Sequence, residues 1–239
     1  MANTTKSFFW LHLKKCAGNS FRKSFTPPYV QTDRVKNPKP FIAVPKEEWN
    51  DVLNNFRIPL GEYDNKRMLF AKKFLYSEDE FNNMYKFTIV RNPYDRIVSV
   101  WKYVFRKRQW QPKRILMKHS FSYFISQLPT IMQKKYDRFL VTHAAPIWPD
   151  ITDENGVLLM DEILKLENLG TDIEILNQKI GTNIKHLSRE NVNRQNNSYR
   201  KYYTEKTKKK VEELYGDDIK NLKYTFSFLA PILSLFICI

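Results

Sequence analysis

The chain has 239 residues, of which 42% are hydrophobic and 15% aromatic, so the composition excludes a disordered chain and favours one large folded domain. Lys and Arg together number 40 against 25 Asp and Glu, and the net charge of +15 indicates an anionic ligand or partner without choosing among nucleic acid, anionic lipid, phosphorylated cofactors and acidic glycans. The two cysteines are too few for a disulfide framework and suit a reducing compartment.

The first motif along the chain is an apolar run that enters a short turn containing lysine and glycine. Residues 7–13 read as a buried strand and residues 18–24 as the start of a helix. Such a strand–turn–helix can cradle a phosphate, because the helix start presents unpaired N–H groups and Gly18 allows close approach of the backbone. An ordinary turn with solvated lysines is the alternative. The turn lacks the glycine pattern of a Walker A motif, which disfavours an ATPase, and His12 is expected to be a packed core residue.

The next part of the chain is rich in proline. Residues 26–66 contain six prolines and are expected to be mostly loop, with a short helix within 49–56. Residues 67–71 are a candidate short strand, and Ser77 with glutamates in the following turn is a helix N-cap signal. Residues 86–90 read as a second, clear strand.

A basic residue and a hydroxyl residue follow this second strand. Arg91 lies at its carboxyl end, Pro93 starts a helix, and Ser99 comes two helical turns later. Ligands of open α/β sheets bind beyond the carboxyl ends of the strands, so Arg91 and Ser99 are candidates for a second phosphate beside the first turn. The alternative for Arg91 is an ion pair with Asp95, and Arg96 is expected to pair with a neighbouring carboxylate.

The remaining elements continue an alternation of strands and helices. They are a helix at 120–128, a loop at 147–156, a strand-rich segment at 157–166, a helix capped by Thr171 that ends at Gly181, and a helix at 205–215 capped by Thr204. This alternation favours a parallel α/β sheet.

The last residues, 226–239, are almost entirely apolar and uncharged. They are fewer than the ~20 residues that a spanning helix requires, and Pro231 interrupts them. A final packed element, a tail anchor or membrane-surface segment, and a non-native end are the alternatives. No signal peptide or N-terminal anchor is recognised, so we expect a cytoplasmic protein with membrane contact through this tail left open.

The two phosphate-binding candidates together resemble motifs of the sulfotransferase family that uses 3′-phosphoadenosine 5′-phosphosulfate (PAPS), in its carbohydrate sulfotransferase-like branch. Residues 12–20 are similar to the 5′-phosphosulfate loop His-Ile-Pro-Lys-Thr-Ala-Gly-Thr-Ser, with the family's lysine at Lys15 and Lys14 in the usual place of the proline. Residues 90–99 resemble the 3′-phosphate motif Val-Arg-Asn-Pro-x-Asp-Arg-x-Val-Ser. The resemblance extends from Phe8 to Tyr224.

This resemblance implies a three-layer α/β sandwich with a short parallel sheet and a P-loop-like strand–loop–helix, in a single domain at 1–225. It implies transfer of a sulfuryl group from PAPS to a hydroxyl, with a carbohydrate as the expected acceptor, anionic or neutral, and with no metal and no nucleic acid. Lys15 would stabilise the leaving group. The cofactor-binding residues that the resemblance implies are Lys15, Cys16, Ala17, Gly18, Asn19, Ser20, Arg91, Ser99, Asn193 and Arg194.

The base for the acceptor hydroxyl has two rival candidates. Many members of the family carry a histidine after the second strand, whereas residues 70–74 here contain none and Lys73 is closest to that place. A lysine acts as a base only where burial or nearby cations lower its pKa, and the alternative is that Lys72 and Lys73 bind an acidic substrate or face water. His143, in a segment similar to a His-x-x-Pro element of the family, is the second candidate.

Two other functions stay open at this point. One is a non-catalytic module that binds nucleic acid or an anionic membrane, and the other is a degenerate sulfotransferase that binds the donor but lacks a base. The acceptor and the oligomeric state are not indicated by the sequence.

Overall fold

The structure is a computed structural model that describes residues 8–24, 35–107, 112–135, 137–182, 184 and 199–226. Its centre is a three-stranded parallel sheet in the order β1 (Phe8–Leu11), β2 (Tyr85–Val90) and β3 (Glu162–Lys165). Leu11 pairs with Thr88, and Val90 pairs with Lys165. The carboxyl ends of the strands therefore lie at one edge of the sheet. The expected strands at 7–13 and 86–90 are confirmed, and the segment 157–166 contributes the shorter β3.

The strands β1 and β2 are mainly apolar and buried because both faces of the sheet are covered there, as is usual for parallel sheets, whereas β3 begins with Glu162 and ends with Lys165. Phe9, Leu11, Phe87 and Val90 are fully buried. Thr88 is buried as well, and its hydroxyl donates to the carbonyl of Leu11 at 2.8 Å. The buried hydroxyl of Thr88 thus has a backbone partner, as buried polar groups usually require.

The outer edge of β1 is covered by two asparagines rather than by another strand. Asn50 accepts from Trp10 N at 3.2 Å and donates to Trp10 O at 2.9 Å. Asn54 donates to the same carbonyl at 2.8 Å and accepts from His12 N at 2.8 Å. These amides take the backbone groups that an edge strand would otherwise offer to a further strand.

The connection from β1 to β2 is helical, where the sequence had indicated a strand at 67–71. Its helices are α1 (Gly18–Ser24), α2 (Trp49–Leu53), α3 (Arg67–Phe70) with a π-helical continuation at Ala71–Leu75, and α4 (Glu78–Asn83), with 3₁₀ turns at Phe41–Ala43, Lys46–Glu48 and Gly61–Tyr63. The strand at 67–71 is therefore a wrong prediction. A short apolar run has the same composition in a buried strand and in one turn of buried helix, so it cannot be assigned without its neighbours. The capping box of Ser77 and Glu80 at the start of α4 confirms the N-cap signal.

The described residues of the connection from β2 to β3 form a second, mainly helical part, with an isolated antiparallel bridge between Thr152 and Leu158. It comprises α5 (Pro93–Lys107), α6 (Pro112–His119), α7 (Phe121–Lys134), α8 (Arg138–Ala144) and α9 (Trp148–Ile151). The start at Pro93 is confirmed, and so is a helix at 120–128, for which Ser120 is the N-cap and which continues through Pro129 beyond its predicted end. The short α9 occupies part of the expected loop, which ends in a turn at Gly156 with φ +78°.

After β3, the chain packs first against the sheet and then against the helical part. A 3₁₀ turn at Leu166–Asn168 leads into α10 (Leu169–Ile180), and the 3₁₀ helix Tyr199–Tyr202 precedes α11 (Glu205–Leu214) and α12 (Gly216–Asn221). Thr171 is not the cap of α10, because the helix begins two residues earlier and the Thr171 hydroxyl donates to Asn168 O at 2.8 Å. The left-handed Gly181 at its end and the Thr204 cap of α11 are confirmed.

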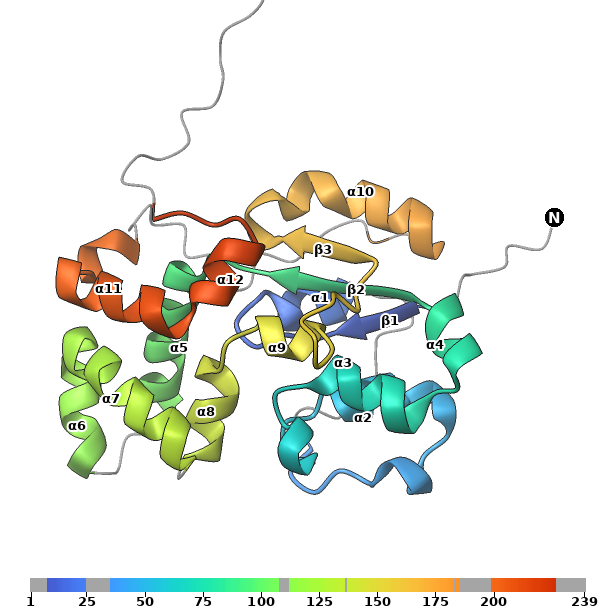
Figure 1. Ribbon diagram of the computed structural model, residues 1–239, viewed down its shortest axis with the longest axis horizontal. Coiled ribbons are helices and arrows are strands. Elements are labelled where there is room, and N and C mark those ends of the chain that lie inside the picture. The colour runs from blue at the N-terminus through green and yellow to red at the C-terminus, as the bar shows by residue number, and fades with distance from the viewer. Residues whose placement is uncertain are drawn as a thin grey trace, which may run out of the picture.

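The arrangement of these elements places the helical part beside the carboxyl ends of the strands (Figure 1). In Figure 1, α10 lies above the sheet, α2 and α3 lie below it, and the arrowheads of the strands point towards α5, α8 and α12. One core cluster surrounds the sheet and a second fills the space among α5, α7, α8 and α11. The predicted α/β fold with a short parallel sheet is confirmed.

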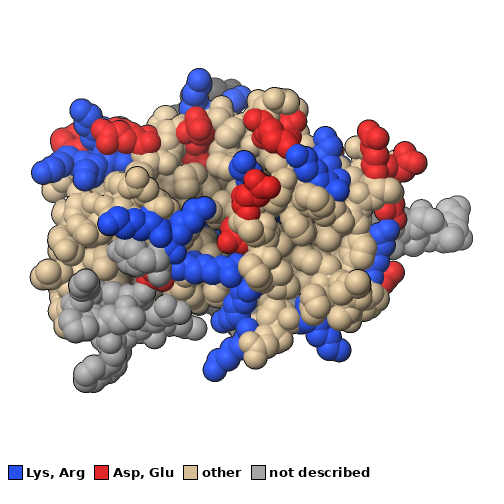
Figure 2. All heavy atoms as spheres, turned by 60° about the horizontal axis from the view of Figure 1, so that its bottom comes forward, with Lys and Arg blue, Asp and Glu red and all other residues tan. Residues whose placement is uncertain are grey.

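Two surface features complete the description. Lys and Arg side chains form a band from the left of the centre to the lower rim of the face in Figure 2, with acidic side chains beside its upper end. Phe226, the first residue of the predicted tail, packs edge-on against Tyr94 at 4.9 Å between ring centroids. Residues 227–239 lie outside the described residues. No described helix is both long enough and apolar enough to cross a membrane.

Candidate functional site

The loop at 12–17 and Arg91 meet at the carboxyl edge of the sheet. The loop follows β1, Arg91 follows β2, and these two strands are paired neighbours. An Nη1 hydrogen of Arg91 is donated to the carbonyl oxygen of Lys15 at 3.4 Å. The two anion-binding candidates therefore lie at one edge of the sheet, as expected, and contact each other directly.

The backbone of the loop forms a concave turn of the kind that binds anions. Lys15 has φ +68° and Ala17 has φ +63°, both in the left-handed region, whereas Cys16 between them does not. Alternation of this kind is typical of anion-binding nests, and we call residues 15–18 the nest. One of its N–H groups, that of Cys16, is donated within the loop to Leu13 O at 3.4 Å. Each left-handed non-glycine residue costs roughly 1–2 kcal/mol, so surrounding contacts must hold the turn in place. With only seven residues, α1 adds less to the site than this nest does.

Gly18 is required by a neighbouring side chain rather than by a ligand. A Cβ atom at Gly18 would lie 1.7 Å from Nε2 of His12. The His12 ring is itself fixed, because it stacks on Trp10 with ring centroids 5.2 Å apart. Burial, with further contributions from nearby cations such as Lys14, lowers the pKa of His12 well below its usual value. His12 is thus the neutral, packed core residue that was expected, and it fills the space that glycine leaves.

The two loop lysines have different roles. Lys14 is buried, and its Nζ donates to the carbonyl oxygen of Asn54 at 3.0 Å. Lys15 is only partly buried, and its Nζ lies 4.2 Å from the centre of the Tyr103 ring. Of the two loop lysines, Lys15 is therefore the more accessible, and its role in binding a ligand stays a prediction.

Arg91 combines the two roles that the sequence left open. Its Nε donates to Asp95 Oδ2 at 2.9 Å and its Nη2 lies 2.7 Å from the same oxygen. It also contacts the loop, as described above, so the ion pair with Asp95 orients Arg91 at the edge of the nest. The Arg91 side chain is 22% exposed and remains accessible to a ligand.

Ser99 lies between the two contacts that α5 makes with the site. Asp95, Ser99 and Tyr103 follow one another at four-residue spacing and so share one side of the helix. Asp95 contacts Arg91 and Tyr103 contacts Lys15. The hydroxyl of Ser99 takes part in no hydrogen bond among the described residues. Its position supports the predicted role in binding an anion.

The partners of Arg96 differ from the expected carboxylate. Arg96 is buried, and its Nε donates to Lys14 O at 3.2 Å, while its Nη2 donates to His143 O at 3.1 Å and to Ala145 O at 2.7 Å. The expected carboxylate partner is a wrong prediction, because its hydrogen-bond partners are backbone carbonyls. The signal available in the sequence was position, since Arg96 precedes the fully buried Val100 by four residues on α5.

His143 lies beside the loop, at the C-terminal end of α8. Its Nδ1 is 2.7 Å from Phe139 O, so Nδ1 carries the proton of the neutral ring and donates it to this carbonyl. Burial lowers the pKa of His143 to about 3, and the cations Lys14 and Lys15 act in the same direction. The structure thus brings His143 to the site as a neutral side chain.

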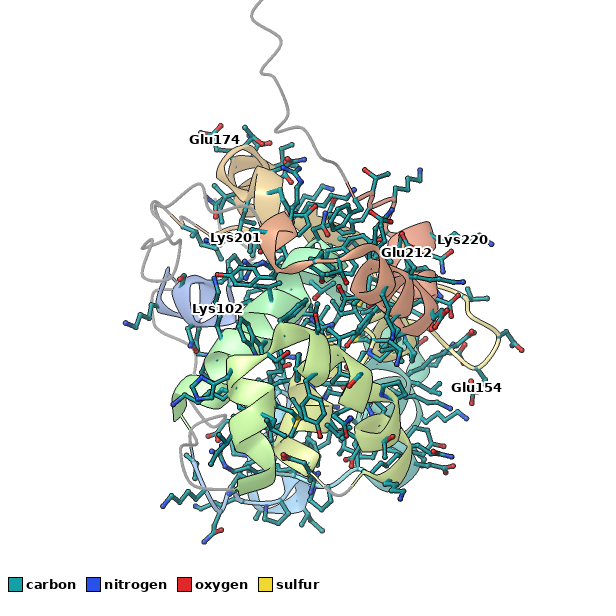
Figure 3. The ribbon with its side chains drawn as sticks, turned by 90° about the vertical axis from the view of Figure 1, so that its left-hand side faces the viewer. Lys102, Glu154, Glu174, Lys201, Glu212 and Lys220 are labelled. Carbon is teal, nitrogen blue, oxygen red and sulfur yellow. The ribbon has the colours of Figure 1, made fainter. Side chains whose placement is uncertain are left out.

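Lys73 is placed in another part of the molecule. Its ammonium forms an ion pair with Glu154, and this hydrogen bond raises the pKa of Lys73. It lies in the π-helical segment that leads through α4 to the amino end of β2, whereas the loop lies beyond the carboxyl ends. Figure 3 shows Glu154 on a loop at the outside of the molecule. The structure does not bring Lys73 into contact with the loop, and a raised pKa does not suit a base.

The remaining predicted residues are placed as follows. Cys16 is buried, and burial raises the pKa of its thiol to about 11, so it acts through its backbone and not as a thiolate. Asn19 is exposed and Ser20 is buried in the first turn of α1. Asn193 and Arg194 lie outside the described residues. In the described part of the chain, no group of three or more His, Cys, Asp or Glu side chains is arranged to hold a metal ion.

Comparison with known proteins gives one match. Residues 1–225 match the family model described as "Sulfotransferase family". A search of curated proteins and a search of solved structures each found no match.

Proposed function

The chain belongs to the sulfotransferase family, and from this premise we propose that it transfers a sulfuryl group from PAPS to a hydroxyl group of a carbohydrate. The observation that carries the proposal is the contact of Arg91 with the carbonyl of Lys15, which joins the nest to a second cationic group at 3.4 Å. A donor with phosphate groups at both its 5′ and 3′ positions matches two adjacent anion-binding groups.

In the proposed reaction, the nest and Lys15 hold the 5′-phosphosulfate. The bond between sulfur and the bridging oxygen breaks, and its electron pair stays on that oxygen while the acceptor oxygen bonds to sulfur and loses its proton. Lys15 and the loop N–H groups stabilise the charge that develops on the leaving oxygen. Loss of one such donor costs roughly 2.7–4 kcal/mol, or about 10²–10³ in rate. Arg91 and Ser99 hold the 3′-phosphate and so keep the donor in line with the acceptor.

The acceptor is proposed to be anionic because of the cations beside α5. Nζ of Lys102 lies 4.8 Å and Nζ of Lys201 lies 5.4 Å from the centre of the Tyr202 ring. Neither lysine forms an ion pair with a carboxylate within the described residues. Lys102 follows Ser99 by three residues and lies near Lys201 in Figure 3. An acidic group of an acceptor would be attracted to these two ammonium groups.

A second candidate function is a donor-binding protein with little turnover. The observation that favours it concerns the two candidate bases, because the pKa of Lys73 is raised and that of His143 is lowered to about 3. Of the two, only His143 contacts residues of the site. In its neutral form its Nε2 can accept a proton from an acceptor hydroxyl, although a group with this pKa is a weak base.

The test of donor binding is calorimetric titration with adenosine 3′,5′-bisphosphate. We expect Arg91→Ala to weaken binding by at least about tenfold, which corresponds to about 1.4 kcal/mol. The exposed Arg138, which pairs with Asp64, is the matched control, and Arg138→Ala is expected to leave the affinity unchanged. Equal affinity for this nucleotide and for unrelated polyanions would refute the proposal and favour a general anion-binding module.

The test of catalysis is transfer of labelled sulfate from PAPS to a panel of oligosaccharides. We expect Lys15→Ala to lower the rate by about 10²–10³. Turnover that survives this substitution would rule out the proposed role of Lys15. Tight nucleotide binding without transfer to any hydroxylated acceptor would instead favour the donor-binding protein.

A further inference from the structure

The contact between Lys15 and Tyr103 is the closest approach of a described cation to a ring at this site. The Lys15 Nζ lies 4.2 Å from the centre of the Tyr103 ring. Tyr103 belongs to α5 and follows Ser99 by four residues, on the same side of the helix. It therefore connects the helix that carries the predicted 3′-phosphate residue with the loop that carries the predicted leaving-group lysine.

The Tyr103 ring is held in this orientation by α8. It stacks on His143 with centroids 5.2 Å apart and planes at 29°, and on Phe139 with centroids 6.0 Å apart and planes at 24°. Phe139 and His143 are themselves 4.2 Å apart, and the His143 Nδ1 is hydrogen-bonded to Phe139 O. A ring packed in this way presents one fixed face to Lys15.

The charge state of this stack suits a lysine contact. A ring attracts an ammonium through its quadrupole, and the attraction grows when the pair is shielded from water. A protonated imidazole stacked on Tyr103 would repel Lys15, but burial among aromatic rings lowers the pKa of His143 to about 3, so its ring is neutral.

We propose that Tyr103 is a positioning residue that holds the Lys15 ammonium over the nest, where the sulfuryl group leaves. The inference rests on the proposed function. A lysine side chain loses rotamer freedom when it is fixed. Tyr103 restrains Lys15 before the donor binds, so less of this freedom is lost during the reaction. His143 then acts as a support for the ring.

The experiment compares Tyr103→Phe, which keeps the aromatic face, with Tyr103→Leu, which removes it. The readout is release of labelled sulfate from PAPS to water, which needs no identified acceptor, with the KM for PAPS measured in parallel. We expect Tyr103→Leu to lower kcat about tenfold, or about 1.4 kcal/mol, with a smaller change in KM. Tyr103→Phe is expected to stay close to wild type.

The decisive control is the same substitution in a Lys15→Ala background. If Tyr103 acts through Lys15, Tyr103→Leu causes no further loss there. An equal loss in both backgrounds, or wild-type kcat in Tyr103→Leu, overturns the inference. Tyr103→Met, which keeps the size without the ring, replaces the leucine variant if that protein does not fold. Failure of the proposed function is distinguishable, because the wild-type protein would then release no sulfate from PAPS, whereas failure of this inference alone leaves wild-type turnover and its loss in Lys15→Ala intact.

Discussion

At the residue scale, Gly18 and His12 share one volume at the start of α1. The sequence suggested that glycine is there to admit an anion, but the histidine ring already occupies that side of Gly18. The ring cannot move aside cheaply, because it is buried against Trp10. The shape of the loop therefore depends on a contact inside the protein as well as on any ligand.

We expect Gly18→Ala to destabilise the protein by about 2–3 kcal/mol, because the new methyl group overlaps a fixed ring. Gly170 in α10 is the matched control, since a Cβ there would meet nothing within 4 Å. Gly170→Ala is expected to be neutral or to stabilise by up to about 1 kcal/mol, as for an exposed helical glycine. Urea unfolding measures both, and equal stabilities of the two variants would contradict the overlap.

His143 gives a prediction about pH. In the unfolded chain it binds a proton below about pH 6.5, whereas in the folded protein its pKa is lowered to about 3. The unfolded state thus binds more protons in this interval, so the free energy of unfolding falls as the pH is lowered from about 6.5. The slope for one proton is at most about 1.4 kcal/mol per pH unit.

His143→Phe removes this proton and keeps an aromatic ring for Tyr103. We expect urea unfolding of the variant to depend less steeply on pH between the two pKa values than unfolding of the wild type does. Other buried groups, such as Asp150 with its raised pKa, are common to both proteins and do not affect the comparison. Identical slopes would show that His143 is not held neutral by the fold.

At the scale of elements, α5 organises the site from two of its sides. One side carries Asp95, Ser99 and Tyr103 towards Arg91 and Lys15. The adjoining side buries Arg96 with Val100 and Val104. The helix therefore packs against the core and also supports the loop. Arg96 takes part in both, because it is buried and donates to the loop carbonyl of Lys14.

We expect Arg96→Gln to lower the free energy of unfolding by about 3 kcal/mol, because buried carbonyls lose their donors. The loop loses its contact through Lys14 O in the same variant, so affinity for adenosine 3′,5′-bisphosphate should fall as well. Arg138→Gln is the control, since Arg138 lies at the surface and an exposed ion pair contributes less than about 1 kcal/mol. Chemical unfolding of both variants measures the difference, and a small loss in Arg96→Gln would mean that the loop is held by other contacts.

At the scale of the whole molecule, the net charge of +15 is not spread evenly. Figure 2 shows a band of basic side chains on one face, and Figure 3 shows Lys102 and Lys201 near each other, with Lys220 on the far side of Glu212. An anionic acceptor would be steered towards such a face, and steering weakens as salt shortens the range of charge interactions.

We expect kcat/KM for a sulfated glycosaminoglycan oligosaccharide to fall as ionic strength rises from about 0.01 M to about 0.15 M, over which the Debye length shrinks from ~30 Å to ~8 Å. An uncharged oligosaccharide should show little change. We expect Lys201→Glu to lower kcat/KM for the charged oligosaccharide more than Lys220→Glu does, although both substitutions change the net charge by the same amount. Equal effects of the two substitutions would assign the salt dependence to the total charge of the protein and not to the neighbouring pair Lys102 and Lys201.

Much of the fold could be predicted from local sequence. The continuous apolar runs gave β1 and β2, and Pro93, Ser77 and Thr204 marked helix starts because their effects act within one turn of backbone. The segment at 67–71 was misassigned because a run of this length is equally apolar as strand or helix. The acceptor half of the site was not predictable. Lys73, the candidate base nearest to the family's histidine, forms an ion pair with Glu154 and does not contact the loop.

The sequence by itself determined the strand–loop–helix, the basic residue at the end of the second strand and the family, because each depends on residues that are neighbours along the chain. Tertiary structure decided which loop lysine is buried, which side chain leaves no room beside Gly18, and that Arg96 binds carbonyls of distant segments. Those answers depend on burial and on contacts between segments far apart in the chain, such as Lys14 with Asn54 and Lys15 with Tyr103. Adjacent lysines are chemically identical in the sequence, and only packing makes one structural and leaves the other at the site.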